Sequence, residues 1–189
     1  MAERGQPAHL VGTAPAAAAL LLTGPPGAGK TTVLTEVLGL LERRGVACAG
    51  IDLDWLCWVE LPGDPGLVDR VLVANLSDVA DRYLRAGVHR LVLARAVEDA
   101  EQARRLRDAL GSPLHVVGLA VDLAVLEQRL GAAPGRAVDD RLADLELARR
   151  LVAAQPAAGE DGPAWVDHWV AATASPRQVA EAVLRAVGW

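Results

Sequence analysis

The stretch GPPGAGKTT occupies residues 24–32 and directly follows the apolar run ALLLT at 19–23. It matches the pattern G-x-x-x-x-G-K-[ST] at every required position. Glycines in such a loop allow successive backbone N–H groups to turn inward and surround phosphate oxygens. The apolar run predicts a buried strand, and the residues after Gly29 predict a helix whose N-terminus also attracts anions. The sequence therefore predicts a loop that binds a nucleoside triphosphate between a strand and a helix.

Lys30 is the only lysine among the 19 Lys and Arg residues of the chain. Its ammonium is a compact charge on a flexible stem that can reach the β- and γ-phosphates, where the planar guanidinium of arginine does not substitute easily. Thr31 is expected to offer its hydroxyl to Mg²⁺, and Thr32 to touch the α-phosphate. The predicted nucleotide contacts of the loop are Gly24, Pro25, Pro26, Gly27, Ala28, Gly29, Lys30, Thr31 and Thr32.

Short apolar runs alternate with longer helical patterns along the rest of the chain. Strands are predicted at 19–23, 46–52, 89–95, 114–121 and 164–172, and helices at 29–45, 97–111, 122–131, 140–154 and 176–188, with one or two more within 65–87. This alternation predicts an α/β fold with about five parallel strands. We expect a flexible tail at 1–15, a single domain over 16–189, and a lid in the Pro-Gly segment near 131–140.

Composition restricts the class of protein. Hydrophobic residues make up 52% of the 189 residues, which is enough for a globular domain with a core. The net charge of −5 argues against nucleic acid as the main partner. Cys48 and Cys57 cannot form a disulfide framework, so we expect reduced thiols and a cytoplasmic protein. No stretch predicts a membrane span, and we expect a monomer or a homodimer.

Two carboxylates follow the second predicted strand, in the segment Ile51-Asp52-Leu53-Asp54-Trp55. The carboxyl ends of parallel strands form the ligand-binding edge of an open sheet. Residues 52 and 54 point to the same side if the strand geometry continues. One carboxylate would then hold Mg²⁺ through water, and the other would accept a proton from an attacking hydroxyl. The alternative is that both cap the next helix and face solvent.

A P-loop followed by a strand that ends in D-x-D resembles the small P-loop kinases of metabolites, such as shikimate kinase, adenylylsulfate kinase, gluconate kinase and the chloramphenicol phosphotransferase type. The likeness covers nearly the whole chain. It implies a P-loop NTPase fold of the nucleoside-monophosphate-kinase-like type, which is a three-layer sandwich. It also implies ATP and Mg²⁺ as cofactors and phosphoryl transfer to a hydroxyl of a small molecule. Shikimate kinases imply metal and acceptor roles for Asp52 and Asp54, whereas the chloramphenicol phosphotransferase type implies Asp52 as the base, so the choice of base stays open.

The chain also departs from these families. It has Leu93-Ala94-Arg95-Ala96 where shikimate kinases carry a glycine triplet after the third strand. Trp55 and Leu56 stand where adenylylsulfate kinases have Asn and Arg. Shikimate and adenylylsulfate are therefore not the expected acceptors. The overall likeness is greatest to small ATP-binding proteins of actinobacterial type.

The resemblance gives roles to several arginines and one proline. Arg95 ends the third predicted strand, beside the P-loop strand, and is expected to grip an anionic group of the acceptor. Arg129 corresponds to an arginine that packs on the adenine, and Arg136 to a lid arginine that reaches the transferring phosphoryl group. The loop that leads to Pro176 corresponds to an adenine-contacting loop. Arg141 is a second candidate for the role of Arg129 or of Arg136. The alternative for these arginines is that they lie on a solvent-exposed helix and have no role in the site.

Acceptor recognition is expected between the D-x-D and the third strand. Trp55 and Trp58 are three residues apart, so they share one face if the segment is helical, and they are candidates to stack on a ring of the acceptor. Core packing is their alternative. Asn75, polar within the apolar stretch VLVANL, is a further candidate, together with Asp54 and Arg95.

A second class of function competes with the kinase, namely a regulatory or partner-dependent nucleotide-binding ATPase without small-molecule kinase activity. A Walker B strand with an adjacent catalytic glutamate would favour that class. The segment GLAVD at 118–122 imitates one, but we expect its strand not to lie beside the P-loop strand and prefer Asp122 as a helix N-cap. The predicted catalytic residues are Lys30, Asp52, Asp54 and Arg136.

Overall fold

Five parallel strands form one sheet in the order β2-β3-β1-β4-β5 in the computed structural model, which describes residues 16–58, 64, 66–132, 138–156 and 162–189. The strands are β1 (Ala18–Thr23), β2 (Cys48–Asp52), β3 (Arg90–Ala94), β4 (Leu114–Ala120) and β5 (His168–Ala171). The helices are α1 (Lys30–Arg43), α2 (Leu67–Arg85), α3 (Ala100–Leu110), α4 (Leu123–Gly131), α5 (Val138–Ala153) and α6 (Pro176–Ala186), with a short 3₁₀ helix η1 (Leu53–Leu56). The predicted tail at 1–15, the centre of the predicted lid and Arg136 lie outside the described residues.

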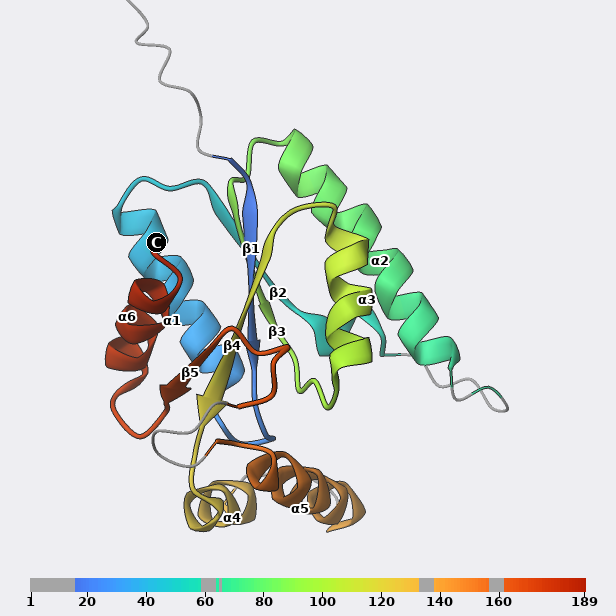
Figure 1. The fold of residues 1–189 in the computed structure, drawn as a ribbon, viewed down its shortest axis with the longest axis vertical. Coiled ribbons are helices and arrows are strands. Elements are labelled where there is room, and N and C mark those ends of the chain that lie inside the picture. Colours follow the sequence, from blue (N-terminus) through green and yellow to red (C-terminus); the bar gives the residue numbers. More distant parts are fainter. Residues whose placement is uncertain (1–15, 59–63, 65, 133–137, 157–161) are drawn as a thin grey trace, which may run out of the picture.

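The sheet is the middle of three layers (Figure 1). Helices α1 and α6 pack together on one face, and α2 and α3 pack together on the other. Helices α4 and α5 lie beyond the carboxyl ends of the strands, next to the loop that follows β1. The predicted three-layer α/β fold with five parallel strands is therefore confirmed.

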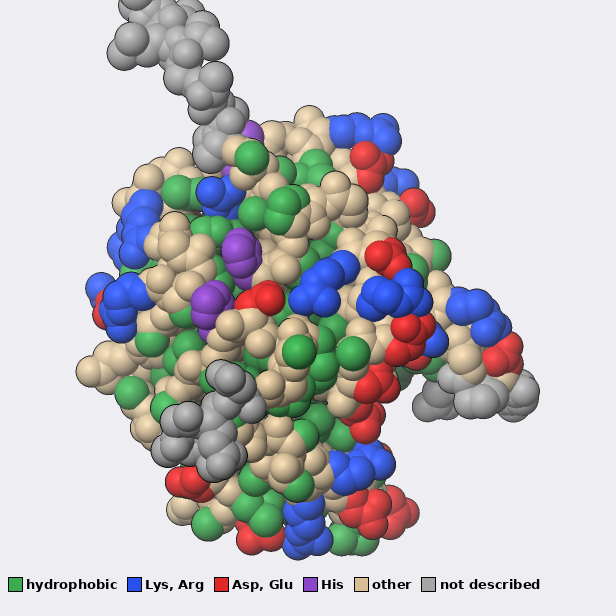
Figure 2. All heavy atoms as spheres, viewed as in Figure 1, with side chains coloured by type: hydrophobic (Ala, Val, Ile, Leu, Met, Phe, Trp, Pro, Cys, Tyr) green, Lys and Arg blue, Asp and Glu red, His purple; other side chains and the backbone are tan. Residues whose placement is uncertain are grey.

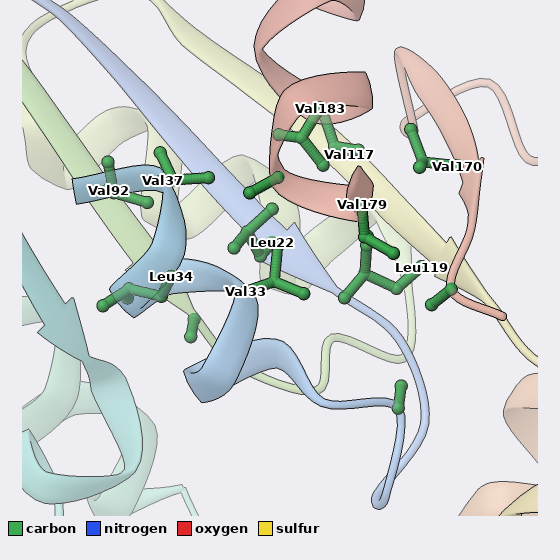
Figure 3. Close-up of a cluster of buried hydrophobic side chains, with 14 of the residues drawn as sticks. Leu22, Val33, Leu34, Val37, Val92, Val117, Leu119, Val170, Val179 and Val183 are labelled. Carbon is green, nitrogen blue, oxygen red and sulfur yellow. The ribbon is translucent and has the colours of Figure 1, made fainter. Parts of the chain in front are cut away.

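Strand β1 lies at the centre of the sheet because both of its faces are apolar. Leu20 and Leu22 belong to the core under α1 and α6, whereas Ala19 and Leu21 belong to the core under α2 and α3. A parallel strand covered on both sides reads as a continuous hydrophobic run, as observed here. Figure 3 shows Leu22 beside Val33 of α1. This packing holds the end of β1, and hence the loop after it, at the carboxyl edge of the sheet.

Strand β5 is shorter than predicted, since it covers His168–Ala171 and not 164–172. Residues 163–166 form a turn in which the Val166 amide donates to the Pro163 carbonyl at 2.9 Å. The carboxylate of Asp167 accepts from the Val116 amide at 2.7 Å, where a strand residue would offer its carbonyl. A turn and a side-chain acceptor therefore replace the first backbone hydrogen bonds that were expected between β4 and β5.

Two further expectations need correction. Strand β4 is hydrogen-bonded directly to β1, so the GLAVD segment does lie beside the P-loop strand. Asp122 nonetheless occupies the N-cap position of α4, where its backbone carbonyl accepts from Val125 and Leu126 and its side chain makes no cap hydrogen bond. The loop expected over 131–140 is also shorter, because α4 includes Gly131 and α5 begins at Val138.

Within the part of the chain that the structure describes, no helix combines the length and the apolar character that crossing a bilayer requires.

Candidate active site

The loop between β1 and α1 has the backbone of a phosphate cradle. Gly24, Gly27 and Gly29 all have positive φ angles. At Gly24 the φ is 142°, and a Cβ atom would lie 2.8 Å from the carbonyl oxygen of Leu119, so only glycine fits there. Helix α1 starts directly after Gly29, which offers no side chain to cap it. The first N–H groups of α1 therefore face the loop, where an anion can accept from them.

Lys30 folds back over this loop. Its Nζ donates to the carbonyl oxygens of Gly24 and Pro25, both at 3.0 Å. Burial lowers the pKa of the ammonium to about 8, against the attraction of the carboxylates of Asp54 and Asp52. The carbonyl oxygens that hold the ammonium carry no net charge. A triphosphate bound in the loop would supply negative charge and so stabilise the protonated form of Lys30.

Thr31 and Asp52 join α1 to the end of β2. The Thr31 hydroxyl donates to Oδ2 of Asp52 at 2.7 Å. The other oxygen of Asp52, Oδ1, accepts from the Asp54 amide at 3.2 Å and caps η1. Asp52 therefore does both things that the sequence presented as alternatives, since it caps a short helix and faces the phosphate-binding loop.

The backbone conformation that places Asp54 in the site differs from the expected one. We expected residues 52 and 54 to share a side of an extended strand, but β2 ends at Asp52 and residues 53–56 form η1. Leu53 is fully buried and acts as the anchor of this turn. The turn places the Asp54 side chain, 70% exposed, in the cleft in front of Lys30. The extended geometry was wrong, although both carboxylates lie close enough to influence Lys30.

A cleft of about 520 Å³ is lined by Lys30, Thr31 and Asp54, whereas Asp52 is not among its lining residues. The residues that line it come from the loop, η1, the end of β3 and two helices: Pro26, Gly27, Gly29, Lys30, Thr31, Thr32, Asp54, Arg95, Ala96, Glu98, Gln102, Asp144 and Leu147. Sequence reasoning missed the last five of these lining residues. Nothing in the local pattern distinguishes Asp144 from the other acidic residues of α5, so only the position of α5 over the loop identifies it.

Arg95 follows β3 and lies deep in the cleft. Its backbone N–H donates to the carbonyl of Leu22 in β1, which fixes its position beside the loop. The guanidinium contacts Asp54 at 3.2 Å and Asp69 of α2 at 4.0 Å, and its Nη1 lies 3.2 Å from Sγ of Cys57. Only 18% of the side chain is exposed. The structure therefore brings Arg95 to the predicted place but surrounds it with protein groups.

Trp55 and Trp58 are exposed, so the core-packing alternative is wrong. Their ring centroids lie 5.1 Å apart, which agrees with the predicted shared face. Asn75 does not contact the loop. Its amide donates to the carbonyl of Leu56 at 2.7 Å and ties η1 to α2. Asn75 thus supports the turn that carries Asp54 and the two tryptophans.

The remaining predicted contacts lie at different distances from the loop. Arg129 on α4 donates to the carbonyl of Gly27 at 3.1 Å, so it lies against the loop. Pro176 is the first residue of α6, where Ser175 and Gln178 form a capping box, and it is not among the described residues that line the cleft. Arg141 lies in α5. The nucleotide roles of these residues stay predictions.

The residues present fit ATP and Mg²⁺. The donor set beside the loop is a hydroxyl and a carboxylate, which are oxygen ligands of the kind that Mg²⁺ takes. Among the described residues no group of three or more His, Cys, Asp and Glu side chains forms a closed metal cage. Mg²⁺ in proteins usually keeps several waters and uses one or two protein oxygens together with substrate phosphates.

The loop, the sheet order and the cleft define a P-loop NTPase fold of the kind found in small P-loop kinases, and the predicted resemblance is confirmed at the level of the fold. The sequence profile of a family described as NTPase matches residues 19–54, which run from β1 to Asp54. No curated protein matches the sequence.

Solved structures share this fold across almost the whole chain. One is the APS kinase of Mycobacterium tuberculosis in complex with AMPPNP and APS, with a TM-score of 0.61, 20% identity and coverage of 93% of this chain and 99% of that one. A sugar kinase from a Janibacter species gives a TM-score of 0.60, 16% identity and coverage of 92% and 95%. A gluconokinase from Sinorhizobium meliloti gives a TM-score of 0.55, 17% identity and 93% coverage of both chains.

Proposed function

We propose that this protein is an ATP-dependent kinase that transfers the γ-phosphoryl group to a hydroxyl of a small molecule. The observation that carries the proposal is the pairing of Thr31 with Asp52, with Asp54 in the same cleft as Lys30. These are the parts that phosphoryl transfer needs, because the protein contributes mainly position and charge to that reaction. The kinases of similar fold support the proposal.

Each residue has a role in this proposal. The loop and Lys30 hold the phosphates, and Thr31 and Asp52 hold the metal, directly or through water. Mg²⁺ at that position would neutralise charge on the phosphates. Asp54 accepts the proton of the acceptor hydroxyl as the oxygen bonds to the γ-phosphorus and the bond to the β,γ-bridging oxygen breaks, which releases ADP.

The geometry favours Asp54 over Asp52 as the base. Both oxygens of Asp52 already accept hydrogen bonds, one from Thr31 and one from the Asp54 amide. Asp54 lines the cleft with a largely exposed carboxylate, and Arg95 contacts only its Oδ1. A proton acceptor has to be within hydrogen-bonding reach of the hydroxyl, and Asp54 meets that requirement more directly.

The test is ADP release from MgATP over a panel of hydroxylated small molecules, with mass spectrometry to detect the phosphorylated product. We expect at least one acceptor to raise ADP release above the hydrolysis background. Asp54→Asn should abolish the transfer. Asp81→Asn is the matched control, because Asp81 pairs with Arg85 on the exposed side of α2.

Hydrolysis that no acceptor stimulates, and that Asp52→Asn and Asp54→Asn leave unchanged, would refute the kinase and favour the regulatory ATPase.

A further inference from the structure

Seven charged side chains form a continuous ladder that starts in the cleft and runs along α3. The ion-pair ladder consists, in order, of Asp54, Arg95, Asp69, Arg105, Glu101, Arg104 and Asp108. Successive N–O distances are 3.2, 4.0, 3.3, 3.1, 2.7 and 2.6 Å. Figure 2 shows acidic and basic side chains side by side over α3. The ladder begins and ends on a carboxylate.

Each arginine of the ladder lies between two carboxylates. Arg95 contacts Asp54 and Asp69, so its single positive charge already has two acidic partners. A guanidinium that is only 18% exposed and paired in this way has to lose a protein contact before it can bind an anion. Arg95 is therefore placed to orient Asp54, and an anionic acceptor would compete with the carboxylates that hold it.

The outer members of the ladder are ionised and paired with one another. Hydrogen bonds from Arg104 and Arg105 lower the pKa of Glu101 to about 2, so this carboxylate stays ionised at assay pH. Lys30 is the other cation that lines the described cleft, and in the proposed function it binds the phosphates of ATP. Of the other acidic residues lining the described cleft, Glu98 pairs with Arg150 at 3.1 Å. At the cleft end of the ladder, the two carboxylates of Asp54 and Asp69 therefore outnumber the one guanidinium of Arg95.

Aromatic surface adjoins the acidic end of the ladder. Trp55 follows Asp54 in the same turn, and Trp55 and Trp58 are 70% and 74% exposed. Two neighbouring tryptophan rings, tilted by 44° to each other and next to Asp54 in the chain, attract organic cations, because the ring faces are electron-rich and the rings cover apolar carbon. Exposed aromatic pairs of this size are uncommon without a binding role, since burial would remove them from water.

We infer that the acceptor is a hydroxyl compound that carries an ammonium group. The ammonium group of the acceptor pairs with the carboxylate of Asp54, at the cleft end of the ion-pair ladder. The carbon skeleton of the acceptor lies against Trp55. This inference rests on the proposed kinase function and specifies the class of its substrate. A neutral or an anionic acceptor is the outcome that would overturn it.

The first experiment measures kcat/KM with MgATP for sets of acceptors that share a carbon skeleton but differ in charge. One set is glucosamine, glucose and gluconate. A second set is an amino alcohol, a diol and a hydroxy acid of equal length. Within each skeleton that is phosphorylated, we expect the amine to exceed the neutral compound by about tenfold and the carboxylate by more. Equal values for amine and neutral compounds, or a preference for the carboxylate, would overturn the inference while leaving the kinase function intact. Absence of transfer to every amine in this set, with transfer to another acceptor in the broader panel, would also overturn the inference, whereas the kinase function is tested by that panel and by Asp52→Asn and Asp54→Asn.

The second experiment changes the ladder at a residue that touches neither nucleotide nor acceptor. Asp69→Asn removes one of the two carboxylates on Arg95, so the ratio of kcat/KM for the amine to that for the carboxylate should fall about tenfold. Asp81→Asn is the control, because it changes the net charge equally but lies outside the ladder. A ratio is insensitive to partial unfolding of a variant. The same ratio in both variants would contradict the role of the ladder.

A third experiment compares the aromatic side chains. Trp55→Ala should raise KM for the amine acceptor about tenfold, whereas Tyr83→Ala, at an exposed position of α2, should not. Unchanged KM in Trp55→Ala would remove the tryptophan from the inferred binding site.

Discussion

The hydroxyl of Thr31 donates a 2.7 Å hydrogen bond to the carboxylate of Asp52, across 21 residues of chain and between two different layers of the fold. Thr31 is in the first turn of α1, and Asp52 is the last residue of β2. Strand β2 does not pair with β1, because β3 lies between them. The pair therefore depends on α1 crossing from β1 back over the sheet to the start of β2, as a right-handed crossover does.

Thr31→Ala should weaken the metal dependence of the protein. It removes one of the two oxygen groups that we assign to Mg²⁺, so turnover should fall at least about tenfold and the Mg²⁺ concentration for half-maximal activity should rise. Thr31→Ser keeps the hydroxyl and should restore most of the activity. Thr35→Ala, one helical turn further along α1, is the control. A Mg²⁺ titration in which Thr31→Ala matches Thr35→Ala would argue against the assignment.

Lys30→Arg should lower phosphoryl transfer at least about 100-fold although it keeps a positive charge. Two backbone carbonyls, 3.0 Å away, hold the ammonium in the space above the loop. A guanidinium is wider and planar, so it cannot take that place without moving the loop. Steady-state kinetics with the best acceptor provide the test, and near-normal turnover would be the contrary result.

Binding of ATP should take up a proton near pH 8. The pKa of Lys30 is about 8 in the nucleotide-free protein, below its ordinary value of 10.5, and triphosphate should raise it. Below about pH 7 the ammonium is already charged and no proton is taken up, whereas above pH 8 uptake grows and apparent affinity falls. Titration calorimetry in two buffers of different ionisation enthalpy measures the uptake. Lys30→Met should abolish it.

The same pKa difference predicts the sign of a stability change. Between pH 8 and 10.5 the unfolded chain keeps the proton on Lys30 longer than the folded protein does. The contribution of this group to the free energy of unfolding should therefore rise with pH across that window. Subtracting the values of Lys30→Met from those of the unaltered protein isolates the contribution, and a decrease with pH would contradict it.

Gly118→Ala should destabilise the fold by about 1–3 kcal/mol. Gly118 on β4 pairs with Trp169 on β5, and a Cβ atom at Gly118 would lie 2.5 Å from the indole ring. Gly131→Ala, at the end of α4 where a Cβ meets nothing within 4 Å, is the matched control and should leave stability unchanged or raise it slightly. Urea denaturation distinguishes the two, and equal midpoints would show that the indole moves aside easily.

The fold was largely predictable because its signals are local. The glycine loop between an apolar run and an amphipathic segment predicts β1, the phosphate cradle and α1 without any knowledge of distant residues. Pro176 after Ser175 predicts the start of α6, and Gly45 the end of α1. The start of β5 was not predictable, because Asp167 replaces a strand carbonyl only where β4 lies beside it.

The conformation of the glycine loop and the position of Lys30 within it follow from adjacent residues, so they could be predicted from residues 19–32 alone. Which other charges face Lys30 depends on the packing of distant elements. This packing turned Asp54 into the cleft through a 3₁₀ helix, placed Asp144 opposite, and enclosed Arg95 between Asp54 and Asp69. The strength of an electrostatic interaction depends on the distance between the charges, and the distances between separate elements are set only once the sheet and its helices have packed.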